Sequence, residues 1–238
     1  MCGRYQQTAT PEAVRALFGY VEWPNFPPRT AIAQSEPISI VHEVFGVRHH
    51  LLVRWGFMPR FVKDPGTFPL LFNARGETVA EKPAFRNALR RRRCLVPATG
   101  FYEWRRDGEG RAVRKTPFLC ERADGAVMAL AGVWETYVAP DGSEVDTAAI
   151  LTTAANGVMA AIHERMPVII EPADFETWLD CRDEDPAAAL GLVRPAGEEV
   201  LVLREVDAEA PRPLRQARPR PAAPAPPKAR DDPQGSLF

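Results

Sequence analysis

Short stretches in which apolar and polar residues alternate constrain the fold of this chain more than any other feature of its sequence. Alternation with a period of two places successive side chains on opposite faces of a strand. Few helical patterns separate these stretches, so we expect an α+β fold: a single domain around a curved, barrel-like, mostly antiparallel sheet with flanking helices. The expected strands cover residues 38–45, 47–55, 118–120, 126–134 and 148–153.

Four short helices are expected beside this sheet. Thr10 precedes Pro11 in a pattern typical of a capped helix start, and Asn156 is placed to cap a helix over residues 157–163. The other two expected helices cover residues 81–91 and a segment that Pro172 opens, in which Phe175, Trp178 and Leu179 face inward.

The first 206 residues have the composition of a domain with a substantial core. The residues after them lack such a composition. The chain has 238 residues, of which 45% are hydrophobic, and this is enough to bury one core. From residue 211 onward, eight prolines are interleaved with alanine and arginine. We therefore expect one domain over residues 1–206 and a disordered Pro/Ala/Arg-rich tail over residues 207–238.

Net charge and cysteine spacing exclude several classes of protein. The formal net charge is −1, so contact with nucleic acid requires a local basic patch. The four cysteines show no C-x-x-C spacing, which argues against a structural zinc site or a disulfide framework, and no cofactor is expected. No apolar segment reaches about 18 residues, so we expect a cytoplasmic protein with no membrane partner.

Arginines cluster at Arg86, at residues 90–93, and at Arg105 and Arg106. A solvated helix end paired with nearby acids explains this clustering, and so does a nucleic-acid surface to which only some of these arginines contribute. Phosphate contacts of the second kind give an affinity that falls with salt and carry no sequence selectivity.

Cys2 follows the initiator methionine directly. Removal of Met1 would leave a free amine and a thiol on one residue, a 1,2-aminothiol that closes a thiazolidine ring with an aldehyde. An α-amine has a lower pKa than a lysine amine, so more of it is neutral and nucleophilic in a cell. The alternative is that Cys2 is only a small buried residue of a first strand.

Four further residues are candidates for chemistry. Glu103 lies among aromatic residues at or just beyond the expected end of a strand, which suits general acid/base work, and His163 lies where a helix should end. Asn73 and Arg75 share one side if their segment is extended, where an amide can orient a reacting group and a guanidinium can hold a phosphate. Each candidate also has a structural explanation. Glu103 is then a solvated glutamate and His163 a helix-end histidine, and Asn73 and Arg75 belong to a turn.

The last residues of the tail form a separate candidate site. Gln234 precedes Leu237 and Phe238 at a spacing that resembles the short peptide with which bacterial proteins dock on the DNA polymerase sliding clamp. A frayed terminus is the alternative.

Six motifs together resemble the SOS-response-associated peptidase family, also called the SRAP domain, in their order and approximate spacing over residues 1–206. They are MCGRY at 1–5, WGFMP at 55–59, NARGET at 73–78, RRRCLVPA at 91–98, GFYEW at 100–104 and HERMP at 163–167.

The resemblance implies an abasic-site shield that cross-links to single-stranded DNA carrying an abasic site. By motif, Cys2 is then the nucleophile after loss of Met1, Asn73 positions the reacting groups, Glu103 moves protons and His163 assists sugar opening. The "peptidase" of the name then describes the loss of Met1, by self-cleavage or by an aminopeptidase. The protein is expected to act as a monomer. The DNA contacts implied are Arg4, Arg75 and Arg165 on phosphates and Trp55, Phe61 and Trp104 as aromatic contacts.

Two segments depart from the family pattern. The early loop has residues 30–34 as TAIAQ where the family commonly has Tyr-Asn-x-Ala-Pro, so a DNA contact by that asparagine is lost. Residues 60–62 are RFV where many members have a tryptophan pair, which leaves Phe61 as the candidate stacking platform. We expect the cross-linking chemistry to be retained.

Two alternatives from other classes remain open. One is a cysteine hydrolase or peptidase that uses Cys2, Glu103 and His163. The other is a non-catalytic DNA-binding module that the tail peptide recruits to the clamp.

Overall fold

Five strands close a barrel in the computed structural model, which describes residues 2–108, 114–183 and 185–207. Within the described residues each of these strands is hydrogen-bonded to two neighbours, in the order β10-β4-β3-β6-β9 with β9 returning to β10. The β4–β10 pairing is parallel and the other four are antiparallel. The expected curved, barrel-like, mostly antiparallel sheet is therefore confirmed. The bounds are β3 (Pro37–Val44), β4 (Val47–Trp55), β6 (Arg93–Ala98), β9 (Met128–Val138) and β10 (Glu144–Ala154).

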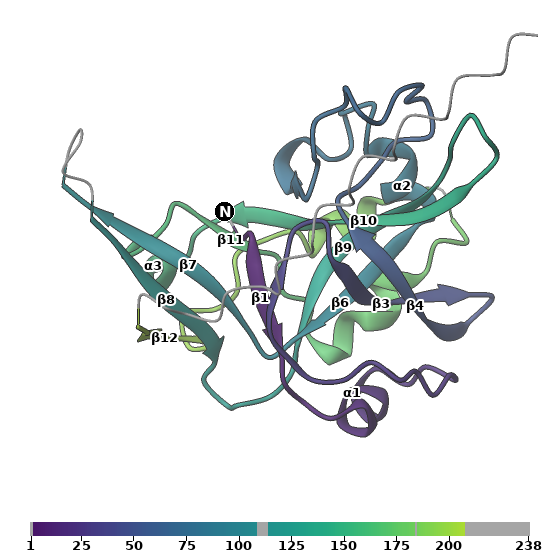
Figure 1. The fold of residues 1–238 in the computed structure, drawn as a ribbon. Helices are drawn as coiled ribbons and strands as arrows, with labels where there is room; N and C mark the ends of the chain where they lie inside the picture. The colour runs from purple at the N-terminus through teal and green to yellow at the C-terminus, as the bar shows by residue number, and fades with distance from the viewer. Residues whose placement is uncertain (1, 109–113, 184, 208–238) are drawn as a thin grey trace, which may run out of the picture.

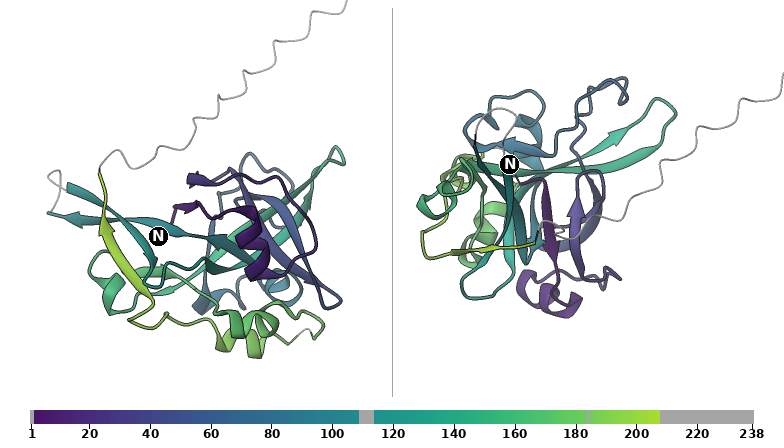
Figure 2. Two further views of the ribbon diagram at one scale, coloured as in Figure 1. Left: turned by 90° about the horizontal axis from the view of Figure 1, so that it is seen from below. Right: turned by 60° about the vertical axis from the view of Figure 1, so that its left-hand side comes forward.

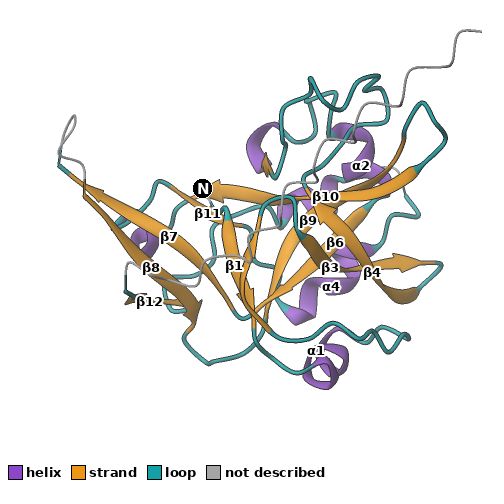
Figure 3. Cartoon of the chain, viewed as in Figure 1, coloured by secondary structure: helices purple, strands orange, loops and turns teal. Residues whose placement is uncertain are grey.

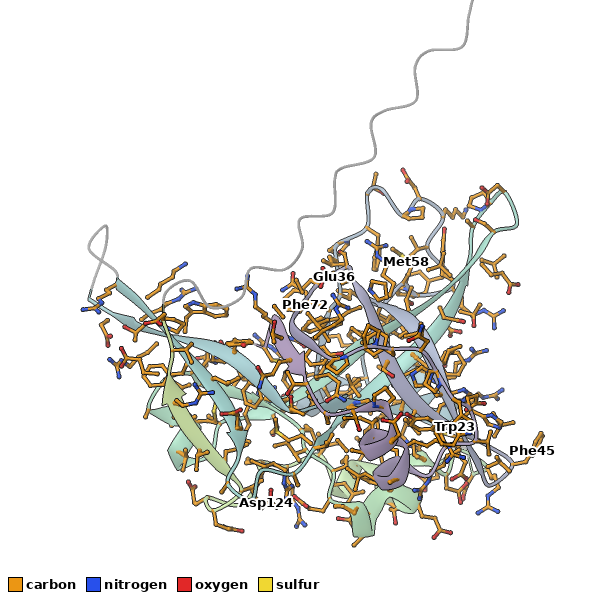
Figure 4. All side chains as sticks on the ribbon, turned by 60° about the horizontal axis from the view of Figure 1, so that its bottom comes forward. Trp23, Glu36, Phe45, Met58, Phe72 and Asp124 are labelled. Carbon is orange, nitrogen blue, oxygen red and sulfur yellow. The ribbon has the colours of Figure 1, made fainter. Side chains whose placement is uncertain are left out.

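The expected strand pair 38–45 and 47–55 forms the β3–β4 hairpin. Phe45 and Gly46, both with positive φ (50° and 80°), make its two-residue turn. Phe45 is 92% exposed and points away from the molecule (Figure 4). Two short strands, β5 (Asn73–Arg75) and β11 (Arg165–Pro167), pair with the C-terminal half of β10.

A second sheet of five strands lies beside the barrel. It is antiparallel throughout and has the order β12-β8-β7-β1-β2. Its β7–β8 hairpin projects from the molecule at the left of Figure 1, and β12 runs along its outer edge in Figure 2. The bounds are β1 (Arg4–Gln7), β2 (Arg29–Ala33), β7 (Gly100–Asp107), β8 (Arg114–Arg122) and β12 (Leu201–Glu205).

Short helices cover the barrel, and side-chain caps explain where two of them begin. In α1 the Thr10 hydroxyl accepts a hydrogen bond of 3.2 Å from the Ala13 N–H, and in α3 the Asn156 side chain accepts one of 2.9 Å from the Met159 N–H. Both caps were predicted. The helices are α1 (Pro11–Phe18), α2 (Arg86–Arg91), α3 (Gly157–Ala160), α4 (Phe175–Leu179) and α5 (Ala187–Gly191), with 3-10 turns η1 (Gly76–Thr78) and η3 (Pro172–Asp174).

Two of the expected helices are shorter than predicted. The helix expected over residues 81–91 begins only at Arg86, because Pro83 lacks an N–H and restricts the residue before it. The helix expected over residues 157–163 ends at Ala160. The segment after Pro172 forms η3 and then α4, and buries Phe175, Trp178 and Leu179 as expected.

The barrel is buried on two sides, which produces two cores. One core joins the barrel to the inner face of the second sheet and includes Cys2, Tyr5 and Trp55. The other lies between the barrel and helices α1, α2 and α4, and includes Phe18 and Trp178. Figure 3 shows α4 against the barrel strands. Because β6 contributes to both cores, all of its residues are buried.

No described helix has the length and apolar character that crossing a membrane requires. The tail peptide with Gln234, Leu237 and Phe238, and residues 208–238 as a whole, lie outside the described residues.

Candidate functional site

The pairing of β1 with β7 brings the N-terminal segment to Glu103. Tyr5 lies opposite Phe101 and Gln6 opposite Gly100. Continuing this antiparallel register toward the N-terminus runs residues 2–4 alongside residues 102–104. The negative charge of Glu103 raises the pKa of the Cys2 thiol. The candidate nucleophile and the candidate acid/base therefore share one site.

Cys2 is a buried thiol at the edge of the core, with 1% of its surface exposed. Its Sγ lies 4.0 Å from the Arg4 carbonyl oxygen, to which the S–H is a weak donor. Burial raises the pKa of this thiol well above its ordinary value, and Glu103 raises it further. The resting form is therefore the protonated thiol, and a nearby group must accept its proton when the sulfur reacts.

Asn73 holds the main chain of Cys2 in place. Its Nδ2 donates a hydrogen bond of 2.9 Å to the Cys2 carbonyl oxygen. Its Oδ1 is buried and has no hydrogen-bond partner among the described residues. A buried amide oxygen without a donor is unfavourable by about 1–3 kcal/mol. The Oδ1 of Asn73 can thus accept a hydrogen bond from a donor that a bound molecule would supply.

Glu103 lies inside β7, three residues after its start, and not at or beyond a strand end as the sequence predicted. The strand continues past Glu103 because β8 pairs with β7 as far as Asp107. The side chain is 4% exposed. It borders a cavity of about 280 Å³ that is lined by Glu103, Trp104, Arg106, Lys115 and His163.

His163 reaches this cavity from the segment between α3 and β11. Its Nδ1 accepts a hydrogen bond of 2.9 Å from the Arg165 N–H, so a neutral ring carries its proton on Nε2. The sequence expected His163 at a helix end, but the helix stops three residues earlier. The backbone bond fixes the ring with Nε2 as a hydrogen-bond donor.

Arg165 is held in a structural ion pair. Its guanidinium donates to both carboxylate oxygens of Glu77, at 2.5 and 2.9 Å, and to the Thr152 carbonyl at 2.7 Å. These bonds lower the pKa of Glu77. They connect the NARGET segment to the HERMP segment across the end of β10. A phosphate contact by Arg165 would have to compete with Glu77, and that contact stays a prediction.

Arg75 and Arg4 have different surroundings. Arg75 lies exposed on β5, two residues from Asn73, and its side chain makes no hydrogen bond or ion pair with a described residue. The guanidinium of Arg4 lies 5.3 Å from the centre of the Trp104 ring, and its buried Nε has no hydrogen-bond partner in the described chain. Trp104 in turn lines the cavity next to Glu103. The phosphate contacts expected of both arginines stay predictions.

Two of the aromatic residues expected to contact DNA differ sharply in exposure. Trp55 is fully buried, packs edge-on against Tyr5 and donates a hydrogen bond of 2.8 Å from Nε1 to the Phe72 carbonyl. Direct contact of Trp55 with DNA is therefore wrong for this conformation, because the ring belongs to the core. Phe61 is 60% exposed and its ring contacts Phe68 edge-on, so its stacking role stays a prediction.

Lys115 is a cavity residue that sequence reasoning missed. It lies opposite Arg106 in the β7–β8 ladder. The sequence singled out Arg106 within a basic cluster but gave no sign of its partner, because that depends on the register of the hairpin. Among the described residues, no group of three or more His, Cys, Asp or Glu side chains is placed to hold a metal ion.

Known proteins resemble this chain over most of its length. A family model described as SOS response associated peptidase (SRAP) matches residues 1–212. Abasic site processing protein YoqW of Bacillus subtilis is 32% identical over 200 residues, which cover 82% of this chain and 87% of that protein. Abasic site processing protein YedK of Escherichia coli is 30% identical over 185 residues, covering 75% of this chain and 79% of that protein.

A solved structure shares the fold. A protein from Bacteroides thetaiotaomicron matches with a TM-score of 0.77 at 24% identity, over 87% of this chain and 93% of that one. This likeness concerns the fold alone.

Proposed function

Because the chain belongs to the SOS response associated peptidase (SRAP) family, we propose that it captures abasic sites in single-stranded DNA as a covalent adduct of Cys2. Relatives named abasic site processing proteins support the lesion as the substrate. The reacting group is the 1,2-aminothiol that forms when Met1 is removed. The DNA partner is a strand whose abasic sugar opens to an aldehyde at C1′.

The capture proceeds in two bond-forming steps. The Cys2 amine adds to the C1′ aldehyde, and loss of one water leaves a C=N bond. The Sγ then adds to the same carbon, its proton passes by way of Glu103 to the nitrogen, and the new C–S bond closes a thiazolidine. One water is released in total, and the sequence needs neither an oxidant nor a reductant.

The hydrogen bond from Asn73 to the Cys2 carbonyl is the observation that carries this proposal. It fixes the main chain of an N-terminal residue, which would otherwise fray. The unpartnered Oδ1 of the same amide is available to a donor such as the Cys2 amine or a sugar hydroxyl. Holding the two reactants in one orientation is worth several kcal/mol of activation free energy in general.

The protonation state of the site supports an aminothiol mechanism over a hydrolase. A cysteine hydrolase uses a thiolate and lowers the pKa of its thiol, but burial and Glu103 raise the pKa of Cys2. In ring closure the amine reacts first, and the thiol needs a base only in the second step. Glu103 would accept that proton, and His163, whose Nδ1 accepts from the Arg165 N–H, would assist opening of the sugar from the same cavity.

The test compares mature protein with protein that keeps an N-terminal tag. Both are incubated with a single-stranded oligonucleotide from which one uracil has been excised, and adducts that survive heating in denaturant are counted. We expect the mature protein to form the adduct and the tagged protein and Cys2→Ala to form none. Equal adduct formation by the tagged protein would exclude the aminothiol mechanism. Turnover of peptides without an adduct would support the hydrolase instead.

A further inference from the structure

Two basic side chains line the cavity beside the β7–β8 hairpin, one ladder pair from its outer end, and the mechanism above uses neither. Arg106 on β7 and Lys115 on β8 line the same space of about 280 Å³ as Glu103, Trp104 and His163. The hairpin projects from the molecule (Figure 1), and the pair lies next to Asp107 opposite Arg114, the last pair of its ladder. The two cations therefore stand where a polymer would pass if it entered the cavity.

The two residues lie directly opposite each other in the ladder. Arg106 pairs with Lys115 in an antiparallel register that runs unbroken from Phe101 opposite Cys120 to Asp107 opposite Arg114. Opposed residues project from the same face of a sheet with their Cβ atoms about 4.5–5.5 Å apart. Like charges at such positions repel and destabilise the sheet. The arrangement becomes favourable when an anion lies between them.

No acidic group of the described chain neutralises this pair. The side chains of Arg106 and Lys115 are exposed and make no ion pair or hydrogen bond with a described residue. The next residue, Arg105, differs in each respect: its side chain points to the opposite face of β7, lies 5.2 Å from the centre of the Phe118 ring and donates to Asp107 at 3.0 Å. Arg105 is thus a matched control one position away.

We propose that Arg106 and Lys115 form a clamp for one backbone phosphate of single-stranded DNA next to the captured sugar. This deepens the proposed function and rests on it for the identity of the strand. Arg106 follows Glu103 by three residues along β7, about 10 Å at the usual rise of a strand, and projects from the opposite face of the strand, although both residues line the cavity. A phosphodiester flanking the lesion can span that distance, and the guanidinium and the ammonium would bind its two free oxygens.

The first experiment measures binding without chemistry. Full-length wild type, Arg106→Gln, Lys115→Gln, the double variant and Arg105→Gln are titrated with an intact fluorescent single-stranded oligonucleotide at several salt concentrations. We expect the double variant to bind at least about tenfold more weakly at low salt. The slope of log K against log salt should fall by about 0.7, the value for one phosphate of a single strand. Arg105→Gln should bind like the wild type.

The second experiment measures the covalent step as a function of DNA concentration on the uracil-excised oligonucleotide. The clamp predicts that the double variant reaches the same maximal rate at a higher DNA concentration. Thermal unfolding should show an equal or higher Tm for the double variant, because removing two like charges relieves repulsion. An equal or higher Tm would show that weaker DNA binding by the double variant does not come from unfolding.

The outcomes separate the clamp from the proposed function. Weaker binding of intact DNA by the double variant, with no adduct from any variant, would keep the clamp and overturn the capture chemistry. Unchanged DNA affinity and salt slope in the double variant, with normal adduct formation, would overturn the clamp and keep the chemistry. A fall in maximal rate at saturating DNA would also overturn the clamp, since it would place the pair in the reaction itself.

Discussion

The side-chain amide of Asn73 donates a hydrogen bond of 2.9 Å to the main-chain carbonyl of Cys2, 71 positions earlier in the chain. This bond ties β5, which pairs with β10 of the barrel, to the N-terminal segment ahead of β1 in the second sheet. It makes the position of the terminal residue a property of the whole fold.

Asn73→Asp should slow adduct formation more than Asn73→Ala does. The aspartate keeps the shape of the side chain but faces the Cys2 carbonyl oxygen with a carboxylate oxygen, which repels it. Because a lost or inverted contact misplaces the nucleophile, we expect a decrease of about tenfold or more in rate, equivalent to about 1.4 kcal/mol of activation free energy. Single-turnover kinetics measure it, with the exposed Asn87→Asp on α2 as the control. An unchanged rate for Asn73→Asp would remove this residue from the site.

Glu103→Gln should separate the two steps of capture. The amide cannot accept the thiol proton, so ring closure slows and the preceding imine accumulates. Borohydride reduces an imine to a stable amine adduct but leaves a thiazolidine unchanged. We therefore expect a larger reducible fraction with Glu103→Gln than with wild type or with Glu144→Gln, an exposed residue of β10. Equal reducible fractions would mean that another group moves the proton.

Stability should fall at alkaline pH because of buried thiols. Burial raises the pKa of Cys94 and Cys120 well above their usual range in the folded chain, as it does for Cys2. The folded state then keeps protons that the unfolded state releases above the ordinary thiol pKa of about 8.5. The stabilisation is complete below that pH and is lost as the pH rises. Urea unfolding at pH 7 and pH 9.5 should show a lower midpoint at the higher pH, and Cys94→Ala should show a smaller difference. A midpoint independent of pH would contradict the burial of these thiols.

Arg75→Gln and Arg165→Gln should have different effects. Arg165 holds Glu77 and the Thr152 carbonyl, so its loss should lower the free energy of unfolding by about 1–3 kcal/mol. Arg75 is exposed without such bonds, so its loss should leave stability unchanged and weaken DNA binding with a smaller salt slope. Chemical denaturation and titrations with intact oligonucleotide distinguish the two. Equal stability losses would contradict the assignment of Arg165 to structure.

Trp55→Phe and Phe61→Ala should also differ. Trp55→Phe removes the bond from Nε1 to the Phe72 carbonyl within the core, and we expect lower stability with unchanged DNA affinity. Phe61 is exposed, and stacking of one base is worth about 1–3 kcal/mol, so Phe61→Ala should weaken DNA binding at least several-fold without a change in Tm. If a fully folded Trp55→Phe variant instead bound DNA more weakly, the Trp55 ring would have to become accessible in the complex.

Local patterns predicted some of the elements, and pairing between distant segments decided the rest. The caps of Thr10 and Asn156 and the strand pair over residues 38–45 and 47–55 are encoded in neighbouring residues, so the sequence alone was enough to predict them. Closure of the barrel depends on β9 returning to β10 and on β4 lying parallel to β10. Those contacts join distant segments, and alternation within one strand does not specify them.

The residues of the candidate site were likewise predicted only in part. Motifs identified Cys2, Asn73 and Glu103, and the structure brings them together. The same motifs offered Trp55 as a DNA contact, although the tryptophan serves the core. Lys115 could not be predicted because its place opposite Arg106 follows from hairpin register and not from residue type.

The intact mass of the protein–DNA adduct shows whether the terminal aminothiol of Cys2 captures the lesion. Mature protein is incubated with the uracil-excised single strand and analysed whole, together with Cys2→Ala. We predict one new species, whose mass is that of the protein lacking Met1 plus that of the DNA minus one water, and no such species for Cys2→Ala. An adduct that retains Met1, or one that Cys2→Ala forms equally well, would contradict this prediction.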